Sequence, residues 1–485
     1  MSAKIPEWVL SYKSKGLEIK SNNGNYYLYK RSTVYNKETG RAKKISGEYL
    51  GKITQDGLIP PKKRKTEPKV MPESKPTLLE YGSSKYLCHI TTDIASLLKK
   101  HFLDLWQTMY VVAILRTIHK IPFKRLQDSY ARSYLSVEYP ELEVSGKSMT
   151  EFLNRLGNLR AQISEFMKAC YNGSRYLLFD GTDIASFSNG MNCNHVGLNK
   201  NGSFDPQFGL LYAFSYGDHP APAYYRAIPG NIKDTAAFKL TVEEMGIRDT
   251  VIVADKAFGT QKNFKMLHSM KLKYVVPLKR NSTKYDKQVL KSGNKADFGG
   301  SFLFNNRPIW HYEKPGCQPE NGGIRIITYL DSELQYREER DYMRRIEQKN
   351  KGYSHIGLLK KQYEFGVLTL QCNIAGSAME AYEVYKQRAA IEQSFDCLKN
   401  VLEQDCSYMH DDVSLEGWCF LNHLSLLFCY RIYSALKSAQ LIKKYSVNDV
   451  LDMFSASHKI LINNQWLDNE ISSKTITLMN NVGFI

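Results

Sequence analysis

Three carboxylates, Asp180, Asp255 and Glu392, stand at positions where together they could bind divalent cations. Asp180 closes the apolar run YLLFD and Asp255 closes VIVAD, and a carboxylate just past an apolar strand lies at the edge of a sheet. If the two strands are neighbours, the two anions face each other and require a cation. Hard oxygen ligands select Mg²⁺ or Mn²⁺. A third carboxylate on a packed helix would complete a two-ion site suited to phosphodiester chemistry. The simpler alternatives are a hairpin turn at Asp180 and a helix cap at Asp255.

The third carboxylate lies in the stretch YKQRAAIEQSFDCLK, residues 385 to 399. An α-helix advances about 100° per residue, so Tyr385, Arg388, Glu392 and Lys399 would fall within about 60° of one another. A neighbouring apolar stripe would hold this helix in a core, and it consists of Ile391, Phe395, Leu398 and Leu402. The helix would therefore present a phenol, a guanidinium, a carboxylate and an ammonium along one edge. The alternative is an ordinary amphipathic helix with solvated charges.

The net charge indicates a polyanionic partner. The chain has 485 residues, and 66 Lys and Arg against 49 Asp and Glu leave a net charge of +17. Residues 1 to 70 hold 16 of the basic residues and 6 of the acidic ones, so the charge is concentrated in one region. That asymmetry favours a dedicated binding module for nucleic acid or anionic lipid.

Other features of the composition argue against several classes of protein. The nine cysteines are scattered without a metal-ligand spacing, which fits a reducing cytosol rather than a disulfide framework. The N-terminal residues lack the apolar core of a signal peptide. The longest apolar run, from Gly417, is interrupted by Asn422, His423 and Arg431, and we expect a buried helix there rather than a membrane span.

The order of predicted elements divides the chain into several regions. GLEIK and YYLYKRSTVYN form a predicted hairpin across SNNGN, and these basic, tyrosine-rich strands could lie against DNA. The runs RYLLFD, FGLLYAFSYG, PAYYRAIPG, DTVIVAD and KYVVPLKRN predict a mixed α/β sheet. The predicted boundaries are 1–60 for a basic β-rich DNA-binding module, 61–76 for a linker, 77–172 for a helical domain, 173–281 with 377–405 for the α/β domain, 282–376 for a β-rich insertion and 406–485 for a C-terminal helical region.

Taken together, these motifs resemble the DDE transposases of bacterial insertion sequences, in the subgroup with a Tyr-x2-Arg-x3-Glu-x6-Lys signature. The chain matches that signature as Tyr385-KQ-Arg388-AAI-Glu392-QSFDCL-Lys399. FDGT resembles the first-aspartate pattern of the family. VADKAF resembles the second, although Lys-Ala stands where an Arg-Gly type step is commoner. Asp183 is a rival to Asp180 as the first ligand. The resemblance covers about residues 174 to 440, and the N-terminal module is also similar to that of one branch of the group.

The resemblance implies a fold, a reaction and its partners. The fold would be ribonuclease-H-like, an α/β class with a mixed sheet and a β-rich insertion, beside the N-terminal β-module and helical domains. The reaction would be metal-dependent cut-and-paste transposition with two Mg²⁺ ions, for which Mn²⁺ could substitute. The partners would be double-stranded DNA, at terminal inverted repeats and target sites, and a second copy of the chain. The location would be the bacterial cytoplasm, on the nucleoid.

The same resemblance assigns roles to individual residues. Asp180, Asp255 and Glu392 would be the catalytic metal ligands. Tyr385, Arg388 and Lys399 would hold phosphates of the transposon end. Relatives cleave through a DNA hairpin, and Trp310 in the insertion could stack on the displaced base or be a core tryptophan. Lys256, directly after Asp255, completes the predicted DNA-binding set.

Two other classes of function remain open at the level of sequence. A transposon-derived protein that binds DNA without cutting it would be favoured by loss of any one of the three carboxylates, and all three are present. Another metal nuclease on the same fold would not need the basic N-terminal module or the large insertion. A glycosidase that uses a carboxylate pair would explain neither the net charge nor the basic residues around Glu392.

Overall fold

The computed structural model describes residues 5–22, 24–36, 41–61, 77–171, 173–198, 203–217, 220–232, 234–280, 282, 284, 288–314, 323–402 and 406–485. The chain forms two compact units, residues 1–75 and 76–485. All but the first residue of the predicted linker 61–76 lies outside the described residues.

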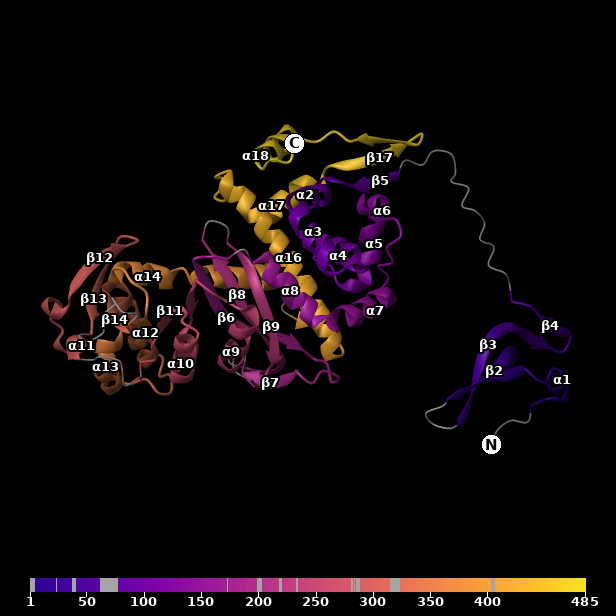
Figure 1. Cartoon of the computed structure of the whole chain (residues 1–485), viewed down its shortest axis with the longest axis horizontal. Helices are drawn as coiled ribbons and strands as arrows, with labels where there is room; N and C mark the ends of the chain where they lie inside the picture. The colour runs from indigo at the N-terminus through magenta and orange to yellow at the C-terminus, as the bar shows by residue number, and fades with distance from the viewer. Residues whose placement is uncertain are drawn as a thin grey trace. The chain divides into compact units, whose positions relative to one another are not determined.

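The N-terminal unit is a four-stranded antiparallel sheet with one short helix (Figure 1). Its elements are α1 (Glu7–Leu10), β1 (Leu17–Asn22), β2 (Asn25–Asn36), β3 (Arg41–Thr54) and β4 (Gly57–Ile59). The predicted hairpin is confirmed, because Asn22 pairs with Asn25 across a turn that contains Gly24 at φ 75°. A small core of Val9, Leu28 and Ile53 joins α1 to one face of this sheet.

The second unit is built on one large mixed sheet, which contains eleven strands among the described residues. At its centre, neighbouring strands follow the order β9, β8, β6, β10, β11. β6 (Tyr176–Ser186), β8 (Phe204–Tyr216) and β9 (Ala221–Pro229) are antiparallel, whereas β10 (Val251–Ala254) and β11 (Lys273–Pro277) run parallel to β6. Parallel neighbours need crossover connections, and α9 (Asp234–Met245) and α10 (Gln261–Ser269) supply them. All five strands predicted here from apolar runs are present.

The predicted insertion extends this sheet instead of forming a separate layer. Its strands are β12 (Gly300–Phe304), β13 (Arg307–Glu313), β14 (Arg325–Asp331) and β15 (Val367–Cys372). They continue the sheet because β15 pairs antiparallel with β11. The helices α11 (Gln288–Ser292), α12 (Ser332–Glu347) and α13 (His355–Lys361) lie between these strands in the sequence.

The helical region after the linker packs on a long C-terminal helix. It contains α2 (Gly82–Ile90), α3 (Thr92–His101), α4 (Trp106–His119), α5 (Leu126–Arg132), α6 (Leu135–Glu138), α7 (Gly146–Gly157) and α8 (Arg160–Cys170). Helix α16 (Asp412–Ser438) contacts α4, α7 and β9 (Figure 1). The predicted buried helix at Gly417 is therefore confirmed. No helix in the described part of the chain is both long and apolar enough to span a membrane.

The C-terminal region, predicted as helical, also contains strands. After α17 (Val447–Ser455), the strands β17 (His458–Ile462) and β18 (Gln465–Asp468) form a hairpin before α18 (Ser473–Asn481). β17 also pairs with β5 (Thr77–Glu80), far away in the sequence. The turn residues Asn463 and Asn464 both have positive φ, 48° and 64°, as a two-residue type I′ hairpin requires. An Asn-Asn pair between apolar runs was the signal for it.

Candidate active site

Asp180 and Asp255 directly follow paired positions on the neighbouring parallel strands β6 and β10. Phe179 of β6 pairs with Ala254 of β10, and an aspartate follows each of these two residues. The spacing of neighbouring strands puts the Cα atoms of the two aspartates about 5 Å apart. The prediction that Asp180 ends its strand is wrong, because β6 continues to Ser186 by pairing with β8. Only the pairing with β10 ends there. Asp255 precedes a 3₁₀ turn (Lys256–Phe258) without capping it through its side chain, so the two carboxylates share one edge.

The helix that was predicted to carry Tyr385, Arg388, Glu392 and Lys399 in one stripe is interrupted twice. α14 (Ala378–Lys386) ends before Arg388, α15 covers Ala389–Asp396, and a π-helical turn covers Cys397–Val401. The backbone N–H groups of Arg388 and Ile391 donate three residues back, to Tyr385 and Arg388. The N–H of Leu402 donates five residues back, to Cys397.

The winding is tighter than an α-helix at Arg388 and wider after Asp396. The polar side chains therefore do not form the straight stripe expected of a uniform α-helix. The apolar stripe beside them is confirmed, because its members are 0% to 6% exposed; they are Ile391, Phe395, Leu398 and Leu402.

Arg388 connects two parts of the site, because it pairs with Asp180 on β6 and with Glu392 on α15. Its guanidinium donates to Asp180 Oδ2 at 3.0 Å and to Glu392 Oε1 at 2.6 Å. Asp180 also accepts from the backbone N–H of Gly181 at 2.9 Å. The Arg388 and Asp180 side chains are 20% and 17% exposed, whereas Glu392 is 57% exposed. Glu392 is therefore accessible to an incoming ligand, while the Arg388–Asp180 pair is largely withdrawn from water.

The electrostatics around Arg388 reflect this cluster of acidic groups. Burial works against the charged guanidinium, but Tyr385 and the nearby carboxylates, Asp255 among them, outweigh it and raise the pKa of Arg388. Burial also raises the pKa of Tyr385, and Arg388 acts in the opposite direction. Four predicted site residues thus lie close enough to Arg388 to interact with it electrostatically: Asp180, Asp255, Tyr385 and Glu392.

Lys399 is held at a different point of the same sheet. Its ammonium donates to the backbone carbonyl of Asp183 on β6 at 2.6 Å. This contact ties the π-helical turn to the strand that carries Asp180. Asp183, the rival first ligand, lies three residues beyond Asp180 on β6 and lines the groove described next.

A groove of about 1390 Å³ opens over this edge of the sheet. Of the predicted residues, Asp183, Asp255, Lys256, Tyr385 and Arg388 line it, whereas Asp180 and Glu392 are not among its lining residues. Two basic residues that sequence reasoning missed, Lys279 and Arg280, also line it at the end of β11. The signal was the same as for the aspartates, since side chains just past parallel strands reach one edge. Arg280 is paired with Glu338 Oε2 at 3.2 Å.

Trp310 lies away from these residues in the sheet of the insertion. It is half-buried on β13 and meets Phe298 edge-on, with ring centroids 6.4 Å apart. The ammonium of Lys295 lies 5.2 Å from its ring centroid. Its indole N–H has no hydrogen-bond partner among the described residues. Trp310 does not line the groove, and its stacking on a base stays a prediction.

The donor set fits a hard divalent cation in chemistry, but the side chains are not gathered around one point. Among the described residues, no group of three or more His, Cys, Asp or Glu is arranged to hold a metal ion. The guanidinium of Arg388 instead pairs with both Asp180 and Glu392. The carboxylates already share a cation there, and oxygen donors of this kind suit Mg²⁺ or Mn²⁺.

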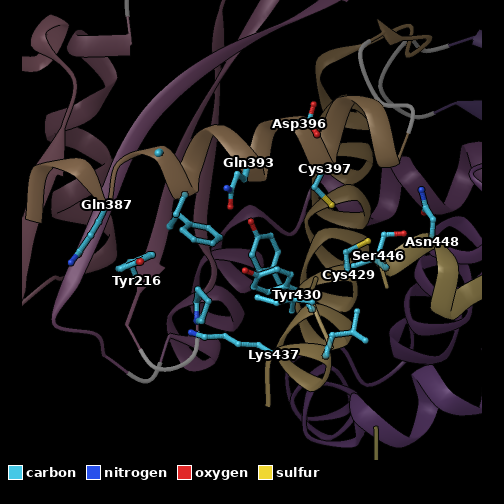
Figure 2. A pocket seen from close by; sticks show the side chains of 18 of the residues that line it. Tyr216, Gln387, Gln393, Asp396, Cys397, Cys429, Tyr430, Lys437, Ser446 and Asn448 are labelled. Carbon is cyan, nitrogen blue, oxygen red and sulfur yellow. The ribbon is translucent and has the colours of Figure 1, made fainter. Parts of the chain in front are cut away.

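The far side of α15 borders a separate cavity of about 610 Å³ (Figure 2). Gln393 of α15 and Cys429 of α16 line it, together with α17 residues such as Asn448. Figure 2 shows the sulfur atoms of Cys397 and Cys429 turned toward each other. Tyr385 and Arg388 line the groove and not this cavity. The groove and the cavity therefore have different lining residues.

Comparison with known proteins identifies a family and several distantly similar solved structures. The family described as "Transposase DDE domain" matches residues 172–428. No curated protein sequence matches the chain. One similar solved structure is titled "Cryo-EM structure of piggyBac transposase synaptic complex with hairpin DNA"; it shares 12% identity and a TM-score of 0.40, over 79% of this chain and 82% of that chain. The family match spans both aspartates, the insertion and Glu392.

Proposed function

The chain belongs to the transposase DDE domain family, and on this premise we propose that it excises and integrates an insertion sequence by cut-and-paste transposition. The observation that carries the proposal is the adjacency of Asp180 and Asp255 across β6 and β10, with Glu392 joined to Asp180 through Arg388. Two carboxylates from distant parts of the sequence thereby lie at one edge of the sheet, and Arg388 connects the third to them.

We propose that Asp180, Asp255 and Glu392 hold two Mg²⁺ ions, which Mn²⁺ can replace. Bound there, such ions supply activation of a hydroxyl nucleophile and stabilisation of the leaving oxygen. The chain's own contribution is to position the carboxylates and to release Arg388 from them. Once free of Asp180 and Glu392, the guanidinium is available to a phosphate of the transposon end, for which its fork geometry is suited. Tyr385 lies beside it at the groove.

Lys256, Lys279 and Arg280 extend this positive lining of the groove. Positive groups along a groove hold the backbone of DNA without reading its sequence. The position of Lys399 on the carbonyl of Asp183 supports an anchoring role, beside the phosphate contact that its place in the signature implies.

The reaction we propose has four bond exchanges. A water molecule hydrolyses one phosphodiester at each transposon end and leaves a 3′-hydroxyl. That hydroxyl attacks the opposite strand, forming a DNA hairpin on the transposon end and releasing the flanking DNA. After hydrolysis opens the hairpin, the 3′-hydroxyl attacks target DNA and displaces a target 3′-oxygen. The groove of about 1390 Å³ is the proposed place for these exchanges.

Several finer features belong to the same proposal. The strand order β9, β8, β6, β10, β11, with the last two parallel to β6, supports a ribonuclease-H-like core. The complete Tyr-x2-Arg-x3-Glu-x6-Lys spacing supports membership in the bacterial insertion-sequence subgroup, acting on the nucleoid. Because two ends must be held together, we propose that two copies of the chain assemble, through the C-terminal helices after residue 406.

The test follows strand products on labelled duplexes taken from the DNA that flanks the coding sequence. We expect cutting with Mg²⁺ and no cutting with EDTA or with Glu392→Gln. A hairpin product would support the proposed route. Tight binding without cutting, in Mg²⁺ and in Mn²⁺ alike, would contradict the proposal in favour of a DNA-binding relative that has lost its chemistry. Cutting at random positions would favour another metal nuclease.

A further inference from the structure

We propose that the open face of the N-terminal sheet, centred on Tyr27 between Lys20 and Lys52, is the surface with which the chain holds the major groove of transposon-end DNA. This inference rests on the proposed function for its choice of DNA as the partner. It assigns a surface and its residues, which the family match, confined to residues 172–428, does not reach.

The two faces of this sheet differ in what covers them. Successive residues of a strand point to opposite faces, and Leu28 and Ile53 lie on the face that packs against Val9 of α1. Tyr27 and Lys52 directly precede these two residues and therefore point to the other face. In the described part of the unit, that face carries half-exposed tyrosines and lysines instead of a second core.

Cross-strand pairing arranges this face as a row across three strands. Lys20 of β1 pairs with Tyr27 of β2, and Tyr27 pairs with Lys52 of β3. Residues directly opposite each other share a face. Three neighbouring strands span about 10 Å, which is close to the major groove's width of about 12 Å. A tyrosine at the centre would face the base edges, and a lysine on either side would reach the two phosphate backbones.

A cluster of aromatic rings gives this row a rigid base. Tyr49 lies 5.2 Å from Tyr29 and 6.2 Å from Tyr27 between ring centroids. The ammonium of Lys20 lies 5.1 Å from the Tyr29 centroid. Burial against these neighbours raises the pKa of Tyr49. Such packed rings lose little conformational freedom on binding, because tyrosine has only two side-chain torsions.

The charges on this unit complement a polyanion. Residues 1 to 70 carry 16 basic and 6 acidic residues. Two acidic residues of this sheet are already engaged: Glu18 accepts from Ser46, and Glu48 pairs with Lys30 at 2.6 Å. Lys20 and Lys52 are therefore the cations that remain for phosphates in the row itself, and phosphate contacts of this kind dominate affinity for DNA.

The test uses the full chain and labelled duplexes from the DNA that flanks the coding sequence, with binding followed by fluorescence anisotropy at several salt concentrations. The double variant Lys20→Gln, Lys52→Gln should bind more weakly and reduce the slope of log K against log salt by about 2, one unit for each lost phosphate contact. Tyr27→Ala should weaken binding by about tenfold with the slope unchanged, as expected for an uncharged contact.

The matched control is Lys13→Gln, Lys15→Gln, which removes the same charge from the segment between α1 and β1. Its slope should stay at the wild-type value. The proposal is overturned if the Lys20, Lys52 variant keeps the wild-type slope, or if the control loses as much as it does. Cutting of the same duplexes by wild-type protein is measured in parallel. Cutting with unchanged slopes would refute the surface alone, whereas no cutting with the expected slopes would refute the transposase alone.

Discussion

The active-site edge of the second unit and the open face of the N-terminal sheet both present charged groups, but they are assembled differently. The candidate active-site edge gathers Asp180, Asp255 and Glu392 from positions far apart in the sequence. Arg388 pairs with Asp180 in a largely buried contact and with the more exposed Glu392. The N-terminal face gathers Lys20, Tyr27 and Lys52 from consecutive strands, and its lysines stay in contact with water.

The two regions should therefore differ in which substitutions disrupt them. The active-site edge depends on the whole core of the second unit, because its residues are placed by strand pairing and helix packing over more than half of the chain. The N-terminal face depends on local hairpins only. The chemistry and the holding of DNA should therefore respond separately to substitution, acid and metal.

The largest expected effect is a loss of DNA cleavage without a loss of DNA binding. Glu392→Gln should lower cleavage by at least about 10³-fold, on the scale of losing a main electrostatic contribution to catalysis, while leaving affinity for flanking duplexes unchanged. The side chain is 57% exposed, so the fold should tolerate the change. Strand cleavage and anisotropy on the same protein sample check this. Equal cutting by the variant would remove Glu392 from the metal site.

Arg388→Ala should affect both cleavage and stability. Cleavage should fall by about 10- to 100-fold through loss of a phosphate contact. Without metal, the free energy of unfolding should drop by about 1.5–3 kcal/mol, because charged hydrogen bonds to two carboxylates are lost. Mg²⁺ should stabilise this variant more than the wild type, since the cation would then replace the guanidinium. Urea titrations with Mg²⁺ and with EDTA measure the difference. An identical response to Mg²⁺ in both proteins would show that Arg388 and the metal do not compete.

Lys399 offers a smaller effect that distinguishes anchoring from phosphate binding. If the contact with the Asp183 carbonyl dominates, Lys399→Gln should cut faster than Lys399→Met, because only the amide retains an N–H donor. The unfolding free energy should fall by about 1 kcal/mol in the methionine variant. Single-turnover cleavage rates compare the two. Equal rates for both variants, with weaker DNA binding in each, would favour the phosphate role.

Acid should weaken the second unit before it changes the N-terminal face. Burial lowers the pKa of His423 to about 3, whereas an unfolded histidine titrates near about 6.5. Between these values the unfolded chain binds a proton that the folded chain does not. The stability is therefore complete above about pH 6.5 and is lost as the pH falls, by up to about 1.4 kcal/mol per unit.

Urea unfolding at pH 7 and pH 5 should show this loss, and His423→Gln should reduce it by about 2 kcal/mol at pH 5. Residues 1–75 contain no histidine, so the salt slope of DNA binding through Lys20 and Lys52 should change little over the same range. If His423→Gln loses as much unfolding free energy between pH 7 and pH 5 as the wild type, groups other than His423 cause the loss.

The sequence predicted the central strands and the apolar stripe of the helix, because both depend on local hydrophobic periodicity. It was less successful where the backbone departs from regular geometry. The tight turn at Arg388 and the π-helical turn after Asp396 were not predicted. The spacing of residues indicates a shared helical face only where the helix winds uniformly. The pairing of β17 with β5 joins segments that no local pattern connects.

The groups available for chemistry follow from the sequence alone: two aspartates after apolar strands, a Tyr-Arg-Glu-Lys spacing and a basic N-terminal segment. These are properties of residue type and order. The folded chain was needed to show that Asp180 lies beside Asp255, that Arg388 bridges Asp180 and Glu392, and that Lys399 contacts β6. The physical reason is that strand register and helix winding are set by packing over the whole core, and a shift of one residue would turn each of these side chains elsewhere.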